Sequence, residues 1–490
     1  MSTTALTTPS AFGRQVMRAV AWRSGSQMIA QAIMWTATFC VIRILSPADY
    51  GLFAMTQSVL VFLSLLNGQE FAVSLIRAPE LTDRAIRQTF GLLLTLNGVI
   101  AAAQWLLAPL AAAYFHHPLV AAMLRVQALL YLANPFIVLP SALLSREMNY
   151  RVQAKVNLLS AVTGAGVSLG GALAGLGVWT LVAAPLAAFW VRAVGMTIAW
   201  GRFPVPSFRL WEASATVRFG SAMLLSSLLW LIQTQADVVI GGRALDPHHL
   251  GLYTEALFLT QIVTAKFIPP LNDVAFSAYA RLQDDRATTG RAFEKSVRLI
   301  MLGALPFYFG LAVTAQPFVD VVLGPQWREA APVVRCLALV MPFVTLQILF
   351  PPAATALGRP RVQVLAAGIG AVLLPIGFLV GVRWGAVGMA ASWLATFPLL
   401  MLGTAWLAIP VIGTSARGLA RAVVPPLLAS VGMAAVVLTV DRLMPGLAAL
   451  PRLALLVASG VATYAALVLL LARDVLDEGL ALVRARATPA

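Results

Sequence analysis

Stretches of roughly 20 apolar residues recur from Ser24 to Leu471, and this recurrence constrains the fold more than any other feature of the sequence. Each stretch is long enough to cross a bilayer core of about 30 Å. Hydrophobic residues make up 60% of the 490 residues and charged residues only 11%, whereas soluble proteins carry roughly a quarter charged residues. The composition excludes a soluble enzyme, a secreted disulfide scaffold and a disordered chain. It predicts a polytopic membrane protein.

The apolar stretches divide into fourteen segments at Pro, Gly and charged residues. Backbone polar groups in lipid must pair within a helix or around a closed barrel, and these segments are too long and too continuously apolar for barrel strands. We therefore predict an all-α fold with about 14 transmembrane helices. They lie at approximately 24–44, 49–67, 88–114, 118–143, 153–173, 178–199, 219–242, 251–275, 296–321, 330–352, 362–382, 385–409, 419–440 and 450–472.

The basic residues support this division. The net charge of +15 does not indicate nucleic-acid binding, because the 34 Lys and Arg residues are spread over short connectors rather than clustered on one face. Most of them fall in alternate connectors if the N-terminus is cytoplasmic, as the positive-inside rule requires. We therefore predict that both termini are cytoplasmic, as a tail over 1–21 and another over 473–490.

The chain also matches itself at a nearly constant offset. Arg43-Ile-Leu-Ser-Pro-Ala-Asp-Tyr-Gly-Leu-Phe53 pairs with Arg243-Ala-Leu-Asp-Pro-His-His-Leu-Gly-Leu-Tyr253, and Arg151-Val-Gln153 pairs with Arg361-Val-Gln363. The period covers six helices, an even number, so both copies enter the membrane from the same side as a parallel repeat. We expect an N-lobe at 22–200, a cytoplasmic linker at 201–217, a C-lobe at 218–410 and two appended helices at 411–472.

Several further stretches carry a family resemblance. They are Ser46-Pro-Ala-Asp-Tyr-Gly-Leu-Phe-Ala-Met55, Gly175-Leu-Gly-Val-Trp-Thr-Leu-Val182, Asp237-Val-Val-Ile-Gly-Gly-Arg-Ala-Leu245 and Leu323-Gly-Pro-Gln-Trp327. In order and spacing, from about Arg23 to Ala408, the chain resembles the Wzx-type flippases. These form the polysaccharide-transport branch of the multidrug/oligosaccharidyl-lipid/polysaccharide exporter superfamily, and the resemblance is to its colanic-acid-exporter-like group.

The resemblance implies an alternating-access flippase in a bacterial inner membrane. Its substrate would be a polyprenyl-pyrophosphate-linked oligosaccharide, moved from the cytoplasmic to the periplasmic leaflet for exopolysaccharide, O-antigen or capsule synthesis. Polymerase and chain-length proteins of the same pathway would be its partners. A small-molecule cation exporter of the same superfamily is the alternative. A membrane polymerase or ligase is a more distant one, because every predicted outer connector is short and holds no catalytic motif.

Two polar stripes are the candidate substrate site, because polar groups inside membrane helices are costly and usually functional. Arg23, Gln27 and Gln31 share one face of the first helix, and Gln233 and Asp237 share one face of the seventh. We expect the stripes to face each other across a cavity, with amides binding sugar hydroxyls and Arg23 binding phosphate. The alternative is that the amides join neighbouring helices and that Arg23 marks the membrane edge.

A second set of polar residues lies in the eighth helix. Lys266 precedes Pro269-Pro270, which must break or kink the helix, and Asp273 follows on roughly the same face. Lys266 is expected to hold the pyrophosphate or to pair with Asp237. Asp237 and Asp273 are candidates for ion coupling. Arg125 and Arg335, which are repeat mates, are expected to make structural contacts within their own lobes.

No cofactor or metal is predicted. The two cysteines lie inside apolar runs, and the histidines come only as the pairs His116-His117 and His248-His249, which we interpret as solvated loop residues. No nucleotide-binding loop is present, so the sequence predicts a transporter without covalent chemistry. The energy source, the sugar and the oligomeric state are not readable from it.

Overall fold

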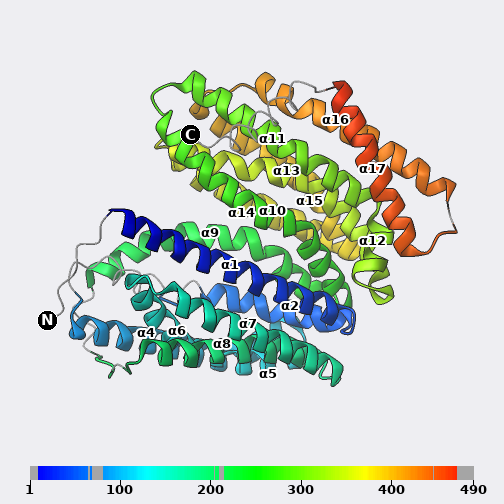
Figure 1. Ribbon diagram of the computed structural model, residues 1–490. Coiled ribbons are helices and arrows are strands. Elements are labelled where there is room, and N and C mark those ends of the chain that lie inside the picture. The colour runs from blue at the N-terminus through cyan, green and yellow to red at the C-terminus, as the bar shows by residue number, and fades with distance from the viewer. Residues whose placement is uncertain are drawn as a thin grey trace. The chain divides into compact units, whose positions relative to one another are not determined.

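The computed structural model describes residues 9–64, 67–68, 81–203, 205–208, 214–444 and 446–471, except for the side chains at 9–21, 23, 214–227 and 471. Every regular element among these residues is helical (Figure 1). The helices are α1 (Pro9–Ile42), α2 (Pro47–Ser64), α4 (Asp83–Phe115), α5 (Pro118–Gln127), α6 (Leu129–Arg146), α7 (Tyr150–Leu173), α8 (Val178–Trp200), α9 (Ser214–Ala244), α10 (Pro247–Arg281), α11 (Arg286–Val313), α12 (Ala315–Val322), η2 (Pro325–Ala330), α13 (Ala331–Ala356), α14 (Arg361–Gly381), η3 (Val382–Trp384), α15 (Gly385–Ile412), α16 (Ala416–Leu443) and α17 (Ala449–Leu471).

Each of the fourteen predicted segments falls on one helix or on two consecutive helices, so the all-α prediction is confirmed. The segment 118–143 is divided between α5 and α6 at Ala128, and 296–321 is divided between α11 and α12 at Thr314. Several helices also begin earlier than predicted, two of them well outside their expected segments. α1 starts at Pro9, inside the expected N-terminal tail, and α9 starts at Ser214, inside the expected linker.

Ten stretches of the described residues are long and apolar enough to cross a membrane. One of them, Arg361–Ile412, contains two of the predicted segments. α2, α9 and α10 are not among the ten; α10 carries Glu255, Lys266 and Asp273, and α9 is only partly described. The protein is therefore a multi-pass membrane protein. The number of crossings and the placement of both termini stay predictions.

The chain forms two compact units, Met1–Ser227 and Leu228–Ala490, with the boundary inside α9. In unit 1, α7 packs against both α1 and α8. In unit 2, α13 packs against α10, α11 and α15, and α16 packs against α11 and α17. The Tyr464 hydroxyl of α17 donates a hydrogen bond of 2.7 Å to the Leu302 carbonyl of α11, so the C-terminal helices belong to unit 2.

The internal repeat also appears in the backbone. Met148 and Gly358 both have positive φ, at 56° and 73°, and each closes the turn between two consecutive predicted segments. Gly175 and Gly385, separated by the same offset, have φ of 74° and 73°. Only glycine adopts this conformation without steric cost, so Met148 is the strained member of its pair.

A second shared feature is a close backbone crossing near the start of one helix in each unit. A Cβ at Gly91 of α4 would collide with the backbone of Ser207, and a Cβ at Gly290 of α11 would collide with the backbone of Gly413. In unit 1 the crossing is fixed by the Ser207 amide, which donates to the Arg87 carbonyl at 2.9 Å, and by Arg87 Nε, which donates to the Val205 carbonyl at 3.0 Å. Part of the predicted linker is thereby fixed to α4.

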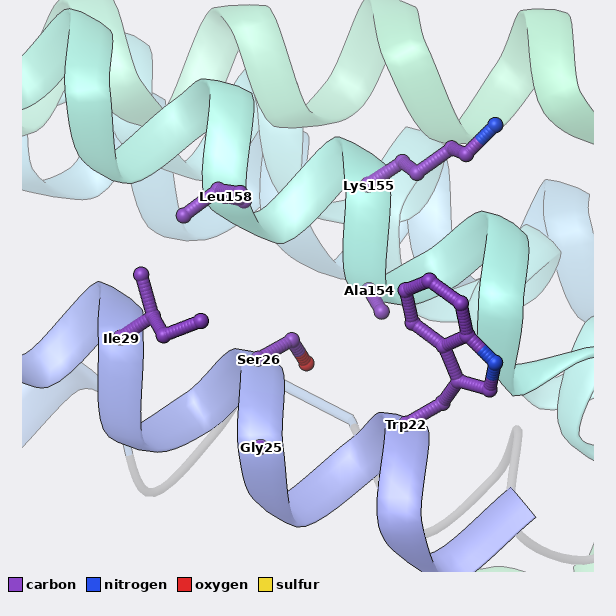
Figure 2. A pocket seen from close by; sticks show the side chains of 7 residues that line it. All are labelled: Trp22, Gly25, Ser26, Ile29, Ala154, Lys155 and Leu158. Atoms are coloured by element: carbon purple, nitrogen blue, oxygen red, sulfur yellow. The ribbon is translucent and has the colours of Figure 1, made fainter. Parts of the chain in front are cut away.

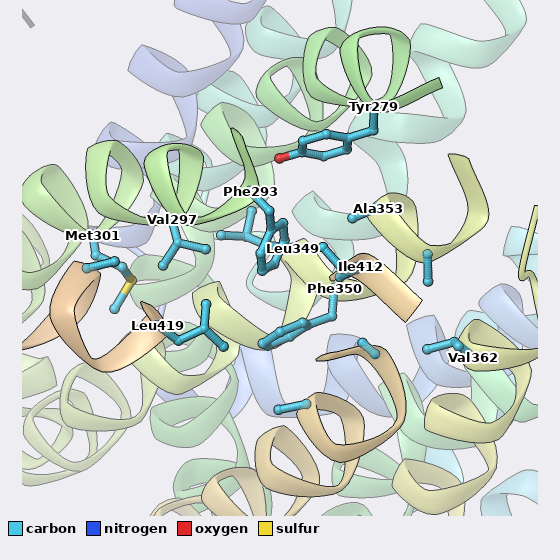
Figure 3. Packing of buried hydrophobic residues seen from close by; sticks show 14 of the residues in the cluster. Tyr279, Phe293, Val297, Met301, Leu349, Phe350, Ala353, Val362, Ile412 and Leu419 are labelled. Carbon is cyan, nitrogen blue, oxygen red and sulfur yellow. The ribbon is translucent and has the colours of Figure 1, made fainter. Parts of the chain in front are cut away.

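An apolar core of unit 2 lies around Phe350 (Figure 3). Phe293 of α11 lies 5.3 Å from the Phe350 ring of α13, with Ile412 of α15 and Leu419 of α16 in the same cluster. Three helices that contribute to it contain consecutive prolines: Pro269-Pro270, Pro351-Pro352 and Pro425-Pro426. The prolines inside the helices of unit 1 are single: Pro109, Pro135, Pro140 and Pro185.

Candidate functional site

The predicted stripe on α1 is only partly packed. The Gln27 side chain is exposed and Gln31 is half-buried, so both amides have surface available to a ligand. The side chain of Arg23 lies outside the described residues. One turn beyond Gln31, and on roughly the same face of α1, Met34 lies beside Gly164 of α7.

The predicted stripe on α9 points into unit 2. Asp237 is only 3% exposed, and its Oδ2 accepts a hydrogen bond of 2.9 Å from the Tyr253 hydroxyl of α10. The same hydroxyl accepts one of 2.8 Å from Trp393 Nε1 of α15. The Gln233 side-chain amide packs against Gly370 of α14. A Cβ added at Gly370 would collide with that amide. A buried carboxyl group is thus held by a chain of two aromatic donors, which the sequence alone did not reveal.

Lys266 and Asp273 are both exposed along α10. No ion pair joins Lys266 to Asp237 among the described side chains, so this alternative for Lys266 is not observed. α10 continues through Pro269-Pro270 without a break. Glu255, another acid of α10 that the sequence interpretation missed, is half-buried inside the same predicted segment.

Asn272 of α10 explains how one of the proline interruptions is tolerated. A proline removes the donor that would bond to the carbonyl four residues earlier, and Pro352 in this way frees the Ile348 carbonyl of α13. The Asn272 side-chain amide donates to that carbonyl at 3.4 Å. An interhelical contact therefore replaces the missing hydrogen bond within the helix.

A groove between α1 and α7 was missed by the sequence interpretation (Figure 2). Its volume is about 330 Å³, within the range of small-molecule sites. Lys155 of α7 extends at the end where Trp22 rises from α1, and the Arg151 guanidinium lies 5.5 Å from the Trp22 ring centroid. The remaining lining is Gly25, Ser26, Ile29, Ala154 and Leu158. Both cations lie in the first turns of α7, which begins at Tyr150, three residues before the predicted segment 153–173.

Each of the repeat-mate arginines contacts its own unit, as expected. Arg125 lies over the Trp105 ring at 4.8 Å from its centroid, and Arg335 Nε donates to the Ala312 carbonyl at 3.4 Å. The second histidine pair is paired with acids: His248 with Glu329 at 3.2 Å and His249 with Asp246 at 2.6 Å. The described side chains contain no group of three or more His, Cys, Asp or Glu placed to hold a metal.

The helical repeat, the polar residues within its helices and the cationic groove define a class: a duplicated helical membrane protein with features suited to an amphiphilic ligand. The chain belongs to the polysaccharide biosynthesis protein family, whose model matches residues 40–332.

Two relatives and one solved structure are similar to it. It is 27% identical over 400 residues to the succinoglycan biosynthesis transport protein ExoT of Rhizobium meliloti (strain 1021), covering 81% of each chain. It is 22% identical over 304 residues to the lipopolysaccharide biosynthesis protein WzxC of Escherichia coli (strain K12), covering 61% of each chain. Its fold is similar to the lipid II flippase MurJ in an inward closed conformation, with a TM-score of 0.73 at 12% identity over 92% of this chain and 99% of that one.

Proposed function

We propose that the protein is an alternating-access flippase that moves a polyprenyl-pyrophosphate-linked oligosaccharide from the cytoplasmic to the periplasmic leaflet of a bacterial inner membrane. The observation that carries the proposal is the match, over 81% of both chains, to a protein named as a succinoglycan biosynthesis transport protein. The family match supports it further. The protein would act as a transporter and not as an enzyme, alongside the polymerase and chain-length proteins of one polysaccharide pathway.

The roles of individual residues belong to the same proposal. Gln27, Gln31 and Gln233 bind sugar hydroxyls through their amides. Arg23 and Lys266 bind the phosphates, because charge-assisted hydrogen bonds from these cations to phosphate oxygens are strong. Asp237 serves in ion coupling, with Asp273 as the second candidate. Burial of Asp237 beside Tyr253 favours this role over direct contact with sugar.

Deletion of the gene tests the function directly. The surface polysaccharide is measured together with the polyprenyl-linked oligosaccharide and the leaflet in which that lipid accumulates. We expect loss of polymer and complete repeat units on the cytoplasmic leaflet. Repeat units trapped on the periplasmic leaflet would instead identify a polymerase or ligase. Normal polymer with new sensitivity to cationic dyes would identify a drug exporter.

The coupling role is tested with Asp237→Asn in proteoliposomes. Asparagine keeps an oxygen that accepts from Tyr253 but cannot exchange a proton. We expect translocation of a fluorescent lipid-linked oligosaccharide to fall to the rate measured without a proton gradient. Asp320→Asn, which alters an acid paired with Arg328 at 2.9 Å, is the matched control and should retain the response. Full gradient dependence in Asp237→Asn would remove Asp237 from the coupling step.

A further inference from the structure

The groove between α1 and α7 lies entirely within unit 1 and is formed by parallel helices. Trp22 and Ile29 of α1 meet Ala154 and Leu158 of α7, and further along Met34 of α1 meets Gly164 of α7, so residue numbers increase together on both helices. The groove thus runs along the helix direction. Its Trp22 end lies near the start of α7, where the charge pattern predicts the cytoplasmic side.

The Trp22 end of the groove is positively charged. Lys155 lines it, and Arg151 lies over the Trp22 ring, an arrangement in which the aromatic face stabilises the cation. No ion pair among the described residues engages Arg151 or Lys155. Two cations without a carboxylate partner attract an anion, and two adjacent cations suit one that carries more than a single charge.

The rest of the groove is apolar and open. Ile29, Ala154 and Leu158 line it, and Met28 and Ile29 are 74% and 55% exposed, as expected for side chains that face lipid. A Cβ at Gly25 would meet no atom within 4 Å, so there is empty space beside the helix at this position. The groove therefore combines a cationic end with a hydrocarbon-lined trough.

We infer that this groove binds the substrate from the cytoplasmic leaflet, with the pyrophosphate between Lys155 and Arg151 and the first isoprene units along Ile29 and Leu158. The inference rests on the proposed function, which supplies the substrate class. A pyrophosphate carries more negative charge than the phosphodiester of a common phospholipid, and this difference favours it at a site with two cations. The groove is an entry subsite, separate from the amide stripe of Gln27 and Gln31.

Binding is tested with the full chain in nanodiscs of phosphatidylcholine. A photoreactive benzoylphenylalanine replaces Ile29, and the probe is radiolabelled polyprenyl pyrophosphate. We expect a crosslink that unlabelled polyprenyl pyrophosphate removes and that Lys155→Gln weakens about tenfold, as loss of one charge-assisted contact predicts. Lys155→Arg should retain it, and Arg442→Gln, at an exposed position of unit 2, is the control for charge removal. Equal competition by phosphatidylglycerol would make the groove a general phospholipid site and overturn the inference.

A steric variant provides an independent test. Gly25→Leu fills the open space without straining the backbone, whereas Gly98→Leu adds the same side chain to α4, also at a position with no atom within 4 Å. We expect Gly25→Leu to abolish binding of the probe and Gly98→Leu to leave it unchanged, with both variants equally well folded by gel filtration. Undiminished binding in Gly25→Leu would place the ligand elsewhere.

The two proposals can fail separately. If the Gly25→Leu variant translocates lipid-linked oligosaccharide at the wild-type rate, the entry subsite is overturned but the flippase is not. If the purified protein binds polyprenyl pyrophosphate in the groove but the deletion strain still makes normal polymer, the flippase is overturned.

Discussion

The two units hold their buried polar groups with different chemistry. In unit 1 the groups are neutral amides: Asn97 of α4 donates to the carbonyls of Asn67 and Leu93 at 3.1 and 2.9 Å and accepts from Asn134 of α6 at 3.0 Å. In unit 2 the central group is the carboxyl of Asp237, followed by Tyr253 and Trp393. Unit 1 therefore has a network with no titratable member, and unit 2 has one with an acid.

The repeat offset shows that this difference arose at matched positions. Ala37 stands in unit 1 where unit 2 has Asp237, Phe53 stands opposite Tyr253, and Ala183 stands opposite Trp393. The turns at Gly175 and Gly385 and the crossings at Gly91 and Gly290 are shared. The two copies thus share the backbone frame, while the interior of unit 2 holds a hydrogen-bond chain of Asp237, Tyr253 and Trp393 that the matched positions of unit 1 lack.

The largest expected effect concerns the shared frame. Gly91→Ala and Gly290→Ala each force a Cβ into the backbone of a crossing segment, and overpacking of this kind costs about 3 kcal/mol. We expect similar losses in the free energy of unfolding from both variants, measured in mixed micelles with increasing SDS. Gly98→Ala and Gly303→Ala, which meet no atom within 4 Å, serve as controls. A loss of unfolding free energy in only one of the two variants would contradict the conclusion that both units depend on the same backbone crossing.

The next effect separates the two interiors. Tyr253→Phe removes the hydroxyl that donates to Asp237 Oδ2 and accepts from Trp393 Nε1. We expect a cost of about 2 kcal/mol, because these two buried polar atoms lose that partner. The reciprocal change Phe53→Tyr adds a hydroxyl to unit 1 and should restore nothing when combined with Tyr253→Phe. The same unfolding measurement checks both variants. Equal stability of Tyr253→Phe and wild type would show that the hydrogen bonds linking Asp237, Tyr253 and Trp393 contribute no stability.

The amide network of unit 1 should be worth less. Asn97→Ala removes two donors and one acceptor, but the Asn67 and Leu93 carbonyls are backbone groups and Asn134 remains close to the Asn67 carbonyl, at 3.5 Å. We expect a loss of about 1 kcal/mol, independent of pH between 5 and 8 because no member titrates. A steep pH dependence in this variant would require a titratable partner in unit 1.

The smallest effect compares two helix caps. Thr82 Oγ1 accepts from the Ala85 amide at the start of α4, and Asp285 Oδ1 accepts from the Thr288 amide at the start of α11. Hydrogen bonds from the Thr288 hydroxyl and amide lower the pKa of Asp285 below its ordinary value of 3.8. The cap therefore stabilises α11 fully above that value and is lost as the pH falls through the lowered pKa.

Hydrogen exchange of the first turns of α4 and α11 measures this difference. Exchange in α11 should rise on acidification below about pH 4, while exchange in α4 should follow only the intrinsic rate. Asp285→Ser, which keeps a capping oxygen without a carboxyl group, should abolish the acid response of α11. A persistent response in Asp285→Ser would assign it to another acid.

The positions of most helices could be predicted because helix ends depend on local chemistry. Prolines begin α2, α5 and α10, and glycine with positive φ follows α8 and α15. The breaks at Ala128 and Thr314 were not predicted, because neither lies at a glycine or a proline. They depend on packing between helices, which a single sequence does not reveal.

The candidate site was less predictable for a related reason. The partners of Asp237 lie far apart in the sequence, at Tyr253 and Trp393, so no spacing rule connects them. Lys155 lies at the start of the predicted segment 153–173, where a cation is expected simply to mark the membrane surface. Only the packing of α7 against Trp22 of α1 places it in a groove.

The paired prolines of unit 2 have a mechanical consequence. Each pair removes two successive hydrogen bonds from α10, α13 or α16, so bending stiffness falls at three fixed points close to the core around Phe350. Residues of this core lie on both sides of the prolines, Ile268 and Tyr279 in α10 and Phe350 and Ala353 in α13, so the core packs across the weakened points. Packing around Phe350 therefore has to hold together helix segments that the paired prolines leave joined by fewer backbone hydrogen bonds.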